Sequence, residues 1–106
     1  MKLWLDDLRD VPVDGEWACA RSVNEAISFM ESLEITYASL DHDLGDWASE
    51  GGDGITFVLW MAEHNKWPSE GIAVHSMNPV GAENMLAIIE RYSPYSGKRV
   101  NPASYL

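Results

Sequence analysis

Short apolar runs that alternate with amphipathic segments are the feature of this sequence that most restricts its fold. Residues 35–40 and 71–75 are short and rich in apolar side chains, which is typical of strands. Residues 22–33, 53–66 and 79–92 carry apolar side chains at helical spacing. Strands that are connected by helices pair in parallel through right-handed crossovers. The sequence therefore predicts an α/β protein built on a parallel sheet.

Two further strands are expected near the start of the chain, at residues 2–5 and 16–21. The segment between them is short and turn-like, so no full helix fits there. We expect three layers around a short parallel sheet, with the strand order second, first, third, fourth. This is a flavodoxin-like arrangement without its first helix. The tail from Ser93 shows no clear strand, so the fifth strand is expected to be missing too.

Length and charge limit the functions that this chain can have. Its 106 residues are expected to form one domain, residues 1–106. No apolar run approaches the roughly 20 residues that a membrane helix needs. No signal peptide is visible, and the single cysteine, Cys19, fits a reducing compartment, so we expect a cytoplasmic protein. A net charge of −10 opposes binding to an extended tract of nucleic acid.

Acids, histidines and one arginine follow three of the predicted strands. Because the carboxyl ends of parallel strands share one edge of a sheet, and ligands bind at that edge, we expect these groups to form one composite site. The groups fall into three clusters: Asp6-Asp7-Leu8-Arg9, Asp41-His42-Asp43 and His75-Ser76.

Two of these residues, His42 and His75, suggest proton-transfer chemistry. They follow strands that are expected to be neighbours, so both could reach one phosphate, one as acid and the other as base. Asp41 could orient a histidine in such a site. The alternative for each histidine is a purely structural role, and His64, at the end of a predicted helix, is expected to have only that.

The remaining polar residues have both a ligand-binding and a structural interpretation. Arg9 could grip a phosphate with two hydrogen bonds, or form a salt bridge with a nearby aspartate. Ser76 and Asn78 could donate hydrogen bonds to phosphate oxygens, or cap the following helix. The acids Asp6, Asp7 and Asp41 could hold Mg²⁺ through their oxygens, or form a solvated acidic edge that needs no cofactor.

The strand ends resemble the acid pocket of response-regulator receiver domains. The resemblance implies that the pair Asp6 and Asp7 binds Mg²⁺, that Asp41 corresponds to the phosphate-accepting aspartate, and that Ser76 corresponds to the hydroxyl that senses the phosphate. The chain departs from the receiver pattern in three ways: its first helix is missing, Lys98 lies outside any evident strand, and histidines stand beside Asp41 and Ser76.

Those departures make the chain similar to a narrower group, the cyclic-phosphate processing receiver domains. The resemblance covers most of the chain. It is carried by three blocks: Leu3-Trp4-Leu5-Asp6-Asp7-Leu8-Arg9, Leu40-Asp41-His42-Asp43-Leu44-Gly45 and Val74-His75-Ser76-Met77-Asn78-Pro79-Val80-Gly81. It implies hydrolysis or processing of cyclic phosphates, such as 2′,3′-cyclic nucleotides or RNA ends.

Three hypotheses of function follow. The first is a phosphodiesterase in which His42 and His75 are acid and base, acting on a small phosphorylated ligand, a nucleotide or an RNA end. The second is a degenerate receiver that binds Mg²⁺ or a protein partner without turnover. The third is a metal-dependent hydrolase that uses the aspartates and a histidine as ligands.

Overall fold

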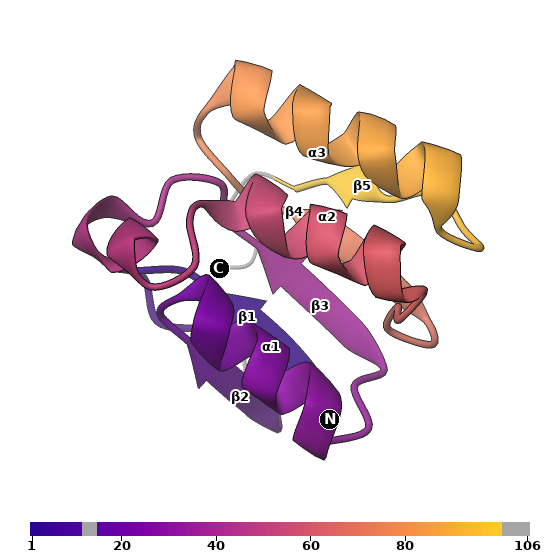
Figure 1. Cartoon of the computed structure of the whole chain (residues 1–106), viewed down its shortest axis with the longest axis horizontal. Coiled ribbons are helices and arrows are strands. Elements are labelled where there is room, and N and C mark those ends of the chain that lie inside the picture. Colours follow the sequence, from indigo (N-terminus) through magenta and orange to yellow (C-terminus); the bar gives the residue numbers. More distant parts are fainter. Residues whose placement is uncertain (12–14, 101–106) are drawn as a thin grey trace.

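The computed structural model describes residues 1–11 and 15–100. In this part of the chain, strands and helices alternate after the second strand, as the sequence predicts (Figure 1). The elements are β1 (Lys2–Leu5), β2 (Trp17–Ala20), α1 (Val23–Ser32), β3 (Tyr37–Leu40), the short 3₁₀ helix η1 (Gly45–Ser49), α2 (Gly54–His64), β4 (Gly71–Val74), α3 (Pro79–Tyr92) and β5 (Lys98–Arg99).

All five strands form one parallel sheet in the order β2-β1-β3-β4-β5. This confirms the expected order of the first four strands and the absence of a helix between β1 and β2 among the described residues. The expected loss of the fifth strand is wrong, because Lys98 and Arg99 pair with Ala73 and Val74 of β4. A two-residue strand was not recognisable from the sequence because it has no apolar pattern and both its residues are exposed.

The three α-helices all lie on one face of the sheet (Figure 1). The steps from β2 to β3, β3 to β4 and β4 to β5 run in the same direction across the sheet, so right-handed crossovers place their helices on the same side. Only the step from β1 to β2 runs the other way, and it holds no helix within residues 6–11 and 15–16. The expectation of three layers is therefore corrected to two layers of secondary structure in the described part of the chain.

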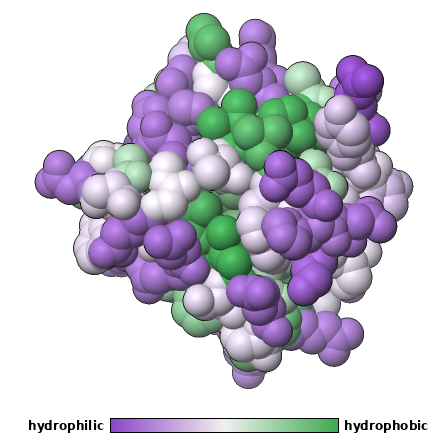
Figure 2. Space-filling model, in the orientation of Figure 1, coloured by the Kyte–Doolittle hydropathy of each residue, from purple (hydrophilic) through white to green (hydrophobic). Residues whose placement is uncertain are grey.

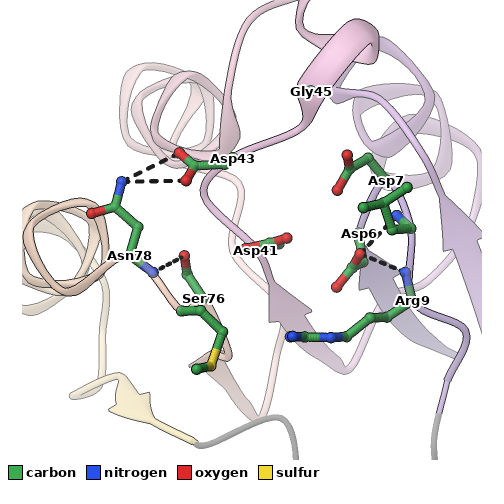
Figure 3. A pocket seen from close by; sticks show the side chains of 10 residues that line it. Asp6, Asp7, Arg9, Asp41, Asp43, Gly45, Ser76 and Asn78 are labelled. Carbon is green, nitrogen blue, oxygen red and sulfur yellow. Dashed lines mark hydrogen bonds between the residues drawn. The ribbon is translucent and has the colours of Figure 1, made fainter.

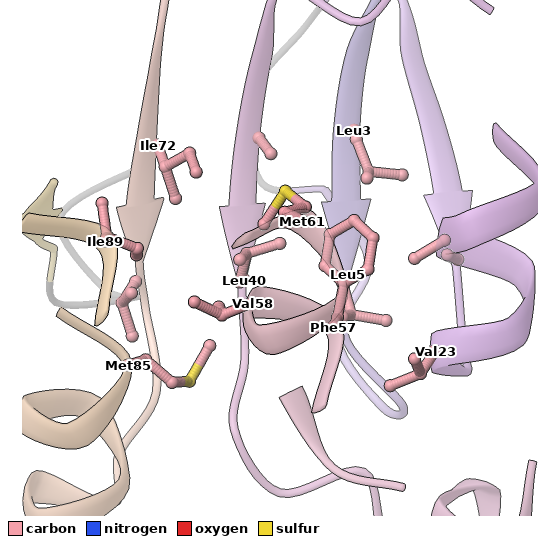
Figure 4. Close-up of a cluster of buried hydrophobic side chains, with 14 of the residues drawn as sticks. Leu3, Leu5, Val23, Leu40, Phe57, Val58, Met61, Ile72, Met85 and Ile89 are labelled. Carbon is pink, nitrogen blue, oxygen red and sulfur yellow. The ribbon is translucent and has the colours of Figure 1, made fainter. Parts of the chain in front are cut away.

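The main core lies between the sheet and this single layer of helices (Figure 4). Alternate strand residues face the helices, as the two-residue period of a strand requires. Leu3 and Leu5 of β1, Leu40 of β3 and Val74 of β4 are each 0% exposed. The helices contribute Phe57 and other buried side chains, which are Val23, Ala26, Val58, Met61, Ala82, Met85 and Ile89.

Two helices begin with side-chain caps. Ser22 Oγ accepts a hydrogen bond from the Glu25 amide at 3.2 Å, and Asn78 Oδ1 accepts one from the Gly81 amide at 3.0 Å. Helix α2 begins differently. The side chain of Asp53 accepts from the Leu44 amide at 3.0 Å instead of capping its own helix. This bond ties the start of α2 to the loop after β3, where the site lies.

Helix α2 also approaches the end of β3 closely through a glycine. The Gly54 amide donates to the His42 carbonyl at 2.7 Å, and a Cβ at position 54 would overlap the Asp41 carbonyl. A glycine is needed here because of this lack of space. The helix N-terminus therefore fixes the backbone of Asp41 and His42.

The helix-covered side of the molecule presents mainly polar residues, with apolar atoms in separate patches (Figure 2). Within the described residues, no helix is long and apolar enough to cross a membrane.

Candidate functional site

A pocket of about 370 Å³ lies at the carboxyl ends of β1, β3 and β4. Figure 3 shows its acidic side chains gathered around Asp41, which follows the middle strand of the three. The residues that line it are Asp6, Asp7, Leu8, Arg9, Asp41, Asp43, Gly45, Ser76, Met77 and Asn78. The structure therefore brings together six of the predicted site residues, which are Asp6, Asp7, Arg9, Asp41, Ser76 and Asn78.

Asp6 is buried and tightly held. Its Oδ1 accepts hydrogen bonds from the amides of Leu8 at 2.9 Å and Arg9 at 2.8 Å, and its Oδ2 lies 3.0 Å from His75 Nε2. Burial disfavours the charged carboxylate, but the hydrogen bonds from His75 and the two amides outweigh it, so the pKa of Asp6 lies below its usual value. Asp6 is therefore a fixed negative charge at the base of the pocket.

His75 is fully buried beneath the pocket and does not line it. Because an ionised carboxylate only accepts hydrogen bonds, His75 Nε2 carries the proton that is donated to Asp6. Its Nδ1 lies 2.8 Å from Ser39 Oγ, and its ring stacks on Trp4 at 4.1 Å between centroids. Both ring nitrogens are thus engaged inside the protein, and His75 acts on the pocket through Asp6.

The carboxylates of Asp7 and Asp41 face the pocket with fewer compensating contacts. Burial and the negative charge of Asp6 raise the pKa of Asp41, although its Oδ1 accepts from the His42 amide at 2.8 Å. Burial raises the pKa of Asp7 as well, with further repulsion from Asp6 and Asp43. Gly45 approaches so closely that a Cβ there would lie 2.7 Å from Asp7 Oδ2. Gly45 therefore packs directly against Asp7, and the repulsion among the carboxylates reflects their closeness in the pocket.

The opposite wall is formed by the loop after β4. Ser76 is buried, and its Oγ accepts from the Asn78 amide at 3.1 Å. Asn78 caps α3 with its oxygen, and its Nδ2 donates to the carboxylate of Asp43 at 3.3 and 3.4 Å. The capping role that the sequence offered for Asn78 is confirmed, and its amide nitrogen still faces the pocket wall (Figure 3).

Among the residues that the structure describes, Arg9 is the only one with a cationic side chain in the pocket lining. No ion pair in the described part of the chain includes its guanidinium; Asp10 pairs instead with Arg21, at 2.7 Å. The backbone of Arg9 is fixed, because its carbonyl accepts from Trp4 Nε1 at 2.9 Å and from Arg21 Nη1 at 3.0 Å. Its side chain is thus available to an anion in the pocket.

His42 lies beside the pocket and is separated from it by Asp43. Its Nδ1 lies 2.7 Å from Asp43 Oδ1, which lowers the pKa of Asp43, and its ring packs against Gly81 at the start of α3. In the sheet, Leu40 is opposite Val74, so continuing the register places Asp41 opposite His75 and His42 opposite Ser76. Since side chains alternate between faces, the two histidines point to opposite sides of the sheet edge.

The acidic wall has the donor chemistry that a hard divalent cation prefers. Asp6, Asp7 and Asp41 offer carboxylate oxygens from two neighbouring strands, and Mg²⁺ binds such ligands while it retains several waters. Oxygens of Asp6 and Asp41 lie within 4.8 Å of each other and of a His75 nitrogen. Because His75 already bonds to Asp6 and lies close to Ser39, the aspartates fit a cation better than the histidine does.

Several pocket residues were not singled out from the sequence. Asp43 was treated only as a neighbour of His42, although it lines the pocket. Ser39, which does not line the pocket, was taken as part of an apolar strand; a polar side chain inside a buried strand needs a partner, and in the structure its Oγ lies 2.8 Å from His75 Nδ1. Leu8 and Met77 gave no signal, because their exposure depends on the tertiary structure.

The parallel sheet, the order of its strands and the acid pocket at their carboxyl ends define a receiver-like α/β domain. The chain matches the family model of the cyclic-phosphate processing receiver domain over residues 1–91, and it belongs to that family.

A solved structure of the DNA-interacting response regulator RcsB from Salmonella typhimurium has a similar fold. The TM-score is 0.63 and the identity is 19%; the similarity covers 99% of this chain and 53% of that chain. This chain thus spans about half the length of the regulator, and the likeness shows the fold alone. No curated protein matches the chain.

Proposed function

We propose that the pocket binds a cyclic phosphate together with a divalent cation and hydrolyses it. The observation that carries the proposal is the charge of the pocket: its lining in the described part of the chain has four carboxylates, those of Asp6, Asp7, Asp41 and Asp43, and one guanidinium, that of Arg9. Such a wall repels a phosphate unless a cation lies between them. The name of the family, cyclic-phosphate processing, supports the choice of ligand.

The polar residues that line the pocket have the following roles in this proposal. Asp6, Asp7 and Asp41 would hold Mg²⁺, whose chemical contribution is to neutralise charge on the phosphate oxygens. Arg9 and the amide nitrogen of Asn78, on opposite walls, would bind the remaining phosphate oxygens. Burial and the charge of Asp6 raise the pKa of Asp41, and a hydrogen bond from the Ser76 hydroxyl offsets part of this rise; the hydroxyl would orient that carboxylate.

The reaction is the addition of water to the cyclic diester. The water oxygen forms a bond to phosphorus, one of the two bridging P–O bonds breaks, and the released ester oxygen becomes a hydroxyl. Asp41, in the middle of the site, would accept the proton of the water. The pair His42 and Asp43 at the rim would return a proton to the leaving oxygen. His75 would position Asp6 and would not touch the ligand.

The decisive experiment follows hydrolysis of 2′,3′-cyclic nucleotides by phosphorus NMR, with Mg²⁺ and with EDTA. We expect turnover that requires Mg²⁺, is reduced at least 100-fold in Asp7→Asn and Asp41→Asn, and persists in Asp46→Asn. Asp46 is the matched control, because it is exposed on η1 and does not line the pocket.

Turnover that survives EDTA but disappears in both His42→Ala and His75→Ala would contradict this proposal. It would support the simpler pair of histidines that the sequence suggested. His75→Ala is informative only together with a melting curve, because its side chain is fully buried.

A second candidate function is a module that binds Mg²⁺ without turnover. It is favoured by one observation: Lys98, the lysine of β5, is exposed and does not line the pocket. Its ammonium group therefore does not assist a reaction at a phosphate in the pocket. Saturable binding of Mg²⁺, measured by calorimetry, with no change in any cyclic phosphate, would support this function over hydrolysis.

A further inference from the structure

Two large apolar side chains stand exposed in the wall of the acidic pocket. Leu8 is 84% exposed and Met77 is 64% exposed, and both line the pocket with the aspartates. Exposed apolar side chains are ordinary when they are scattered over a surface, but here two of them share a single concave site. The proposed chemistry at the phosphate uses neither of them.

The two side chains come from opposite sides of the site. Leu8 follows β1 and Met77 follows β4, and β3, which ends in Asp41, lies between those strands. Neighbouring strands are about 4.8 Å apart, so β1 and β4 are separated by roughly 10 Å. A flat group about 3.5 Å thick fits between side chains that project from two such loops.

Hydrogen bonds hold the backbone of both loops to the site itself. The Leu8 amide donates to Asp6 Oδ1 at 2.9 Å, and Met77 lies between the buried Ser76 and Asn78, whose amide donates to Ser76 Oγ at 3.1 Å. The positions of Leu8 and Met77 are therefore fixed relative to the acids. Ordering these loops costs little when a ligand binds, because they are already ordered.

On the basis of the proposed function, we propose that Leu8 and Met77 hold the two faces of a nucleobase, so that the cyclic phosphate is that of a nucleoside. A base is flat, uncharged and weakly hydrated on its faces, which suits two apolar side chains in a wall that is otherwise anionic. The pocket volume of about 370 Å³ is in the range of sites for ligands much larger than a phosphate group. Leu8 and Met77 are then the residues that determine specificity.

The test compares cyclic phosphates with and without a base. The probes are adenosine 2′,3′-cyclic phosphate and ethylene phosphate, which keeps the five-membered cyclic ester and lacks the nucleoside. Because the nucleotide is expected to turn over in Mg²⁺, the affinity for each probe is measured as the KM for its hydrolysis, followed by phosphorus NMR, for the wild type, Leu8→Ala, Met77→Ala and Leu59→Ala. Leu59 is the matched control, since it is 46% exposed on α2 and lies outside the pocket lining.

We expect the wild type to bind the nucleotide at least tenfold more tightly than ethylene phosphate. Leu8→Ala and Met77→Ala should each weaken binding of the nucleotide about fivefold, because each removes apolar area that the base would cover. Binding of ethylene phosphate should be unchanged in both variants, and Leu59→Ala should match the wild type for both probes.

The failures can be told apart. Equal affinity of the wild type for both probes, or equal weakening of both probes by Leu8→Ala and Met77→Ala, would overturn the nucleobase inference and leave the phosphate site standing. Hydrolysis of neither probe by the wild type would overturn the proposed function, and the inference with it. Because both side chains are exposed, the variants are expected to melt at the wild-type temperature.

Discussion

The two histidines that follow neighbouring strands occupy very different environments. His75 is sealed beneath the sheet edge, stacked on Trp4, with Ser39 Oγ and Asp6 Oδ2 on its two nitrogens. His42 lies at the opposite side of the edge, partly open to solvent, with its Nδ1 beside the exposed Asp43 and its ring against Gly81. His42 lies one residue beyond the position opposite His75, so the two side chains point to opposite faces of the sheet.

A histidine at the end of a strand can therefore have either of two roles. One that is buried with both nitrogens engaged fixes the charge and orientation of a carboxylate. One that is at the rim can exchange a proton with the ligand side of the site. Substitutions at the two histidines and at the residues that contact them can separate these two roles.

Removing the buried ring should give the largest loss of stability. His75→Leu leaves the Asp6 carboxylate buried without its partner, and we expect the free energy of unfolding to fall by about 3 kcal/mol or more. His42→Leu should cost about 1 kcal/mol, because its partner Asp43 is mostly exposed. Urea denaturation of both variants checks this, and equal losses would refute the distinction.

The position of the His42 ring depends on the absence of a side chain at Gly81. A Cβ added by Gly81→Ala would lie 2.5–2.8 Å from atoms of the His42 ring, so the ring must move. We expect a loss of about 1–3 kcal/mol in the free energy of unfolding and a shift of the His42 ring resonances in NMR spectra. Gly71→Ala is the control, since a Cβ there would meet Tyr37 only at 3.6 Å. A normal His42 signal in Gly81→Ala would speak against the close packing.

The outer partner of His75 should contribute less than His75 itself. Ser39→Ala removes the hydroxyl beside Nδ1, and we expect a loss of about 1 kcal/mol in the free energy of unfolding. The NMR signals of the His75 ring should change, while those of His42 should not. Ala38→Ser, at the neighbouring buried position on the helix side, should instead introduce an unsatisfied hydroxyl and leave the His75 signals unchanged. Unaltered His75 signals in Ser39→Ala would contradict the contact.

The smallest expected effect is a gain in stability. Burial and the charge of Asp6 raise the pKa of Asp41 in the folded state, so its ionised form opposes folding at neutral pH. We expect Asp41→Asn to increase the free energy of unfolding at pH 7 in EDTA by about 0.5–1 kcal/mol.

The pH dependence of this gain follows from the same shift. A carboxyl group whose pKa is raised on folding binds its proton more readily in the folded state. Wild-type stability therefore improves as the pH falls through the folded pKa of Asp41, and the advantage of Asp41→Asn should disappear below about pH 4. Denaturation curves at pH 7 and pH 3.5 check this. An advantage that grows on acidification would mean that the pKa of Asp41 is lowered.

Much of the fold followed from local patterns. The apolar runs at 2–5 and 71–75 became β1 and β4, and the helical spacing over residues 22–33 became α1. The acidic site was also predictable in outline, because parallel strands end at one edge and Asp6, Asp7 and Asp41 follow such strands. The faces to which His42 and His75 point were not predicted, because they depend on the register between β3 and β4.

The hydrophobic pattern is sufficient to predict the parallel sheet, the order of its first four strands and the gathering of acids at one edge, because hydrophobic periodicity and right-handed crossovers leave few alternatives. The single layer of helices and the short strand β5 became clear from the three-dimensional structure. The structure also shows that His75 supports Asp6 from within while His42 stands at the rim. The physical reason is that strand register, which joins residues far apart in the chain, sets which face each side chain occupies.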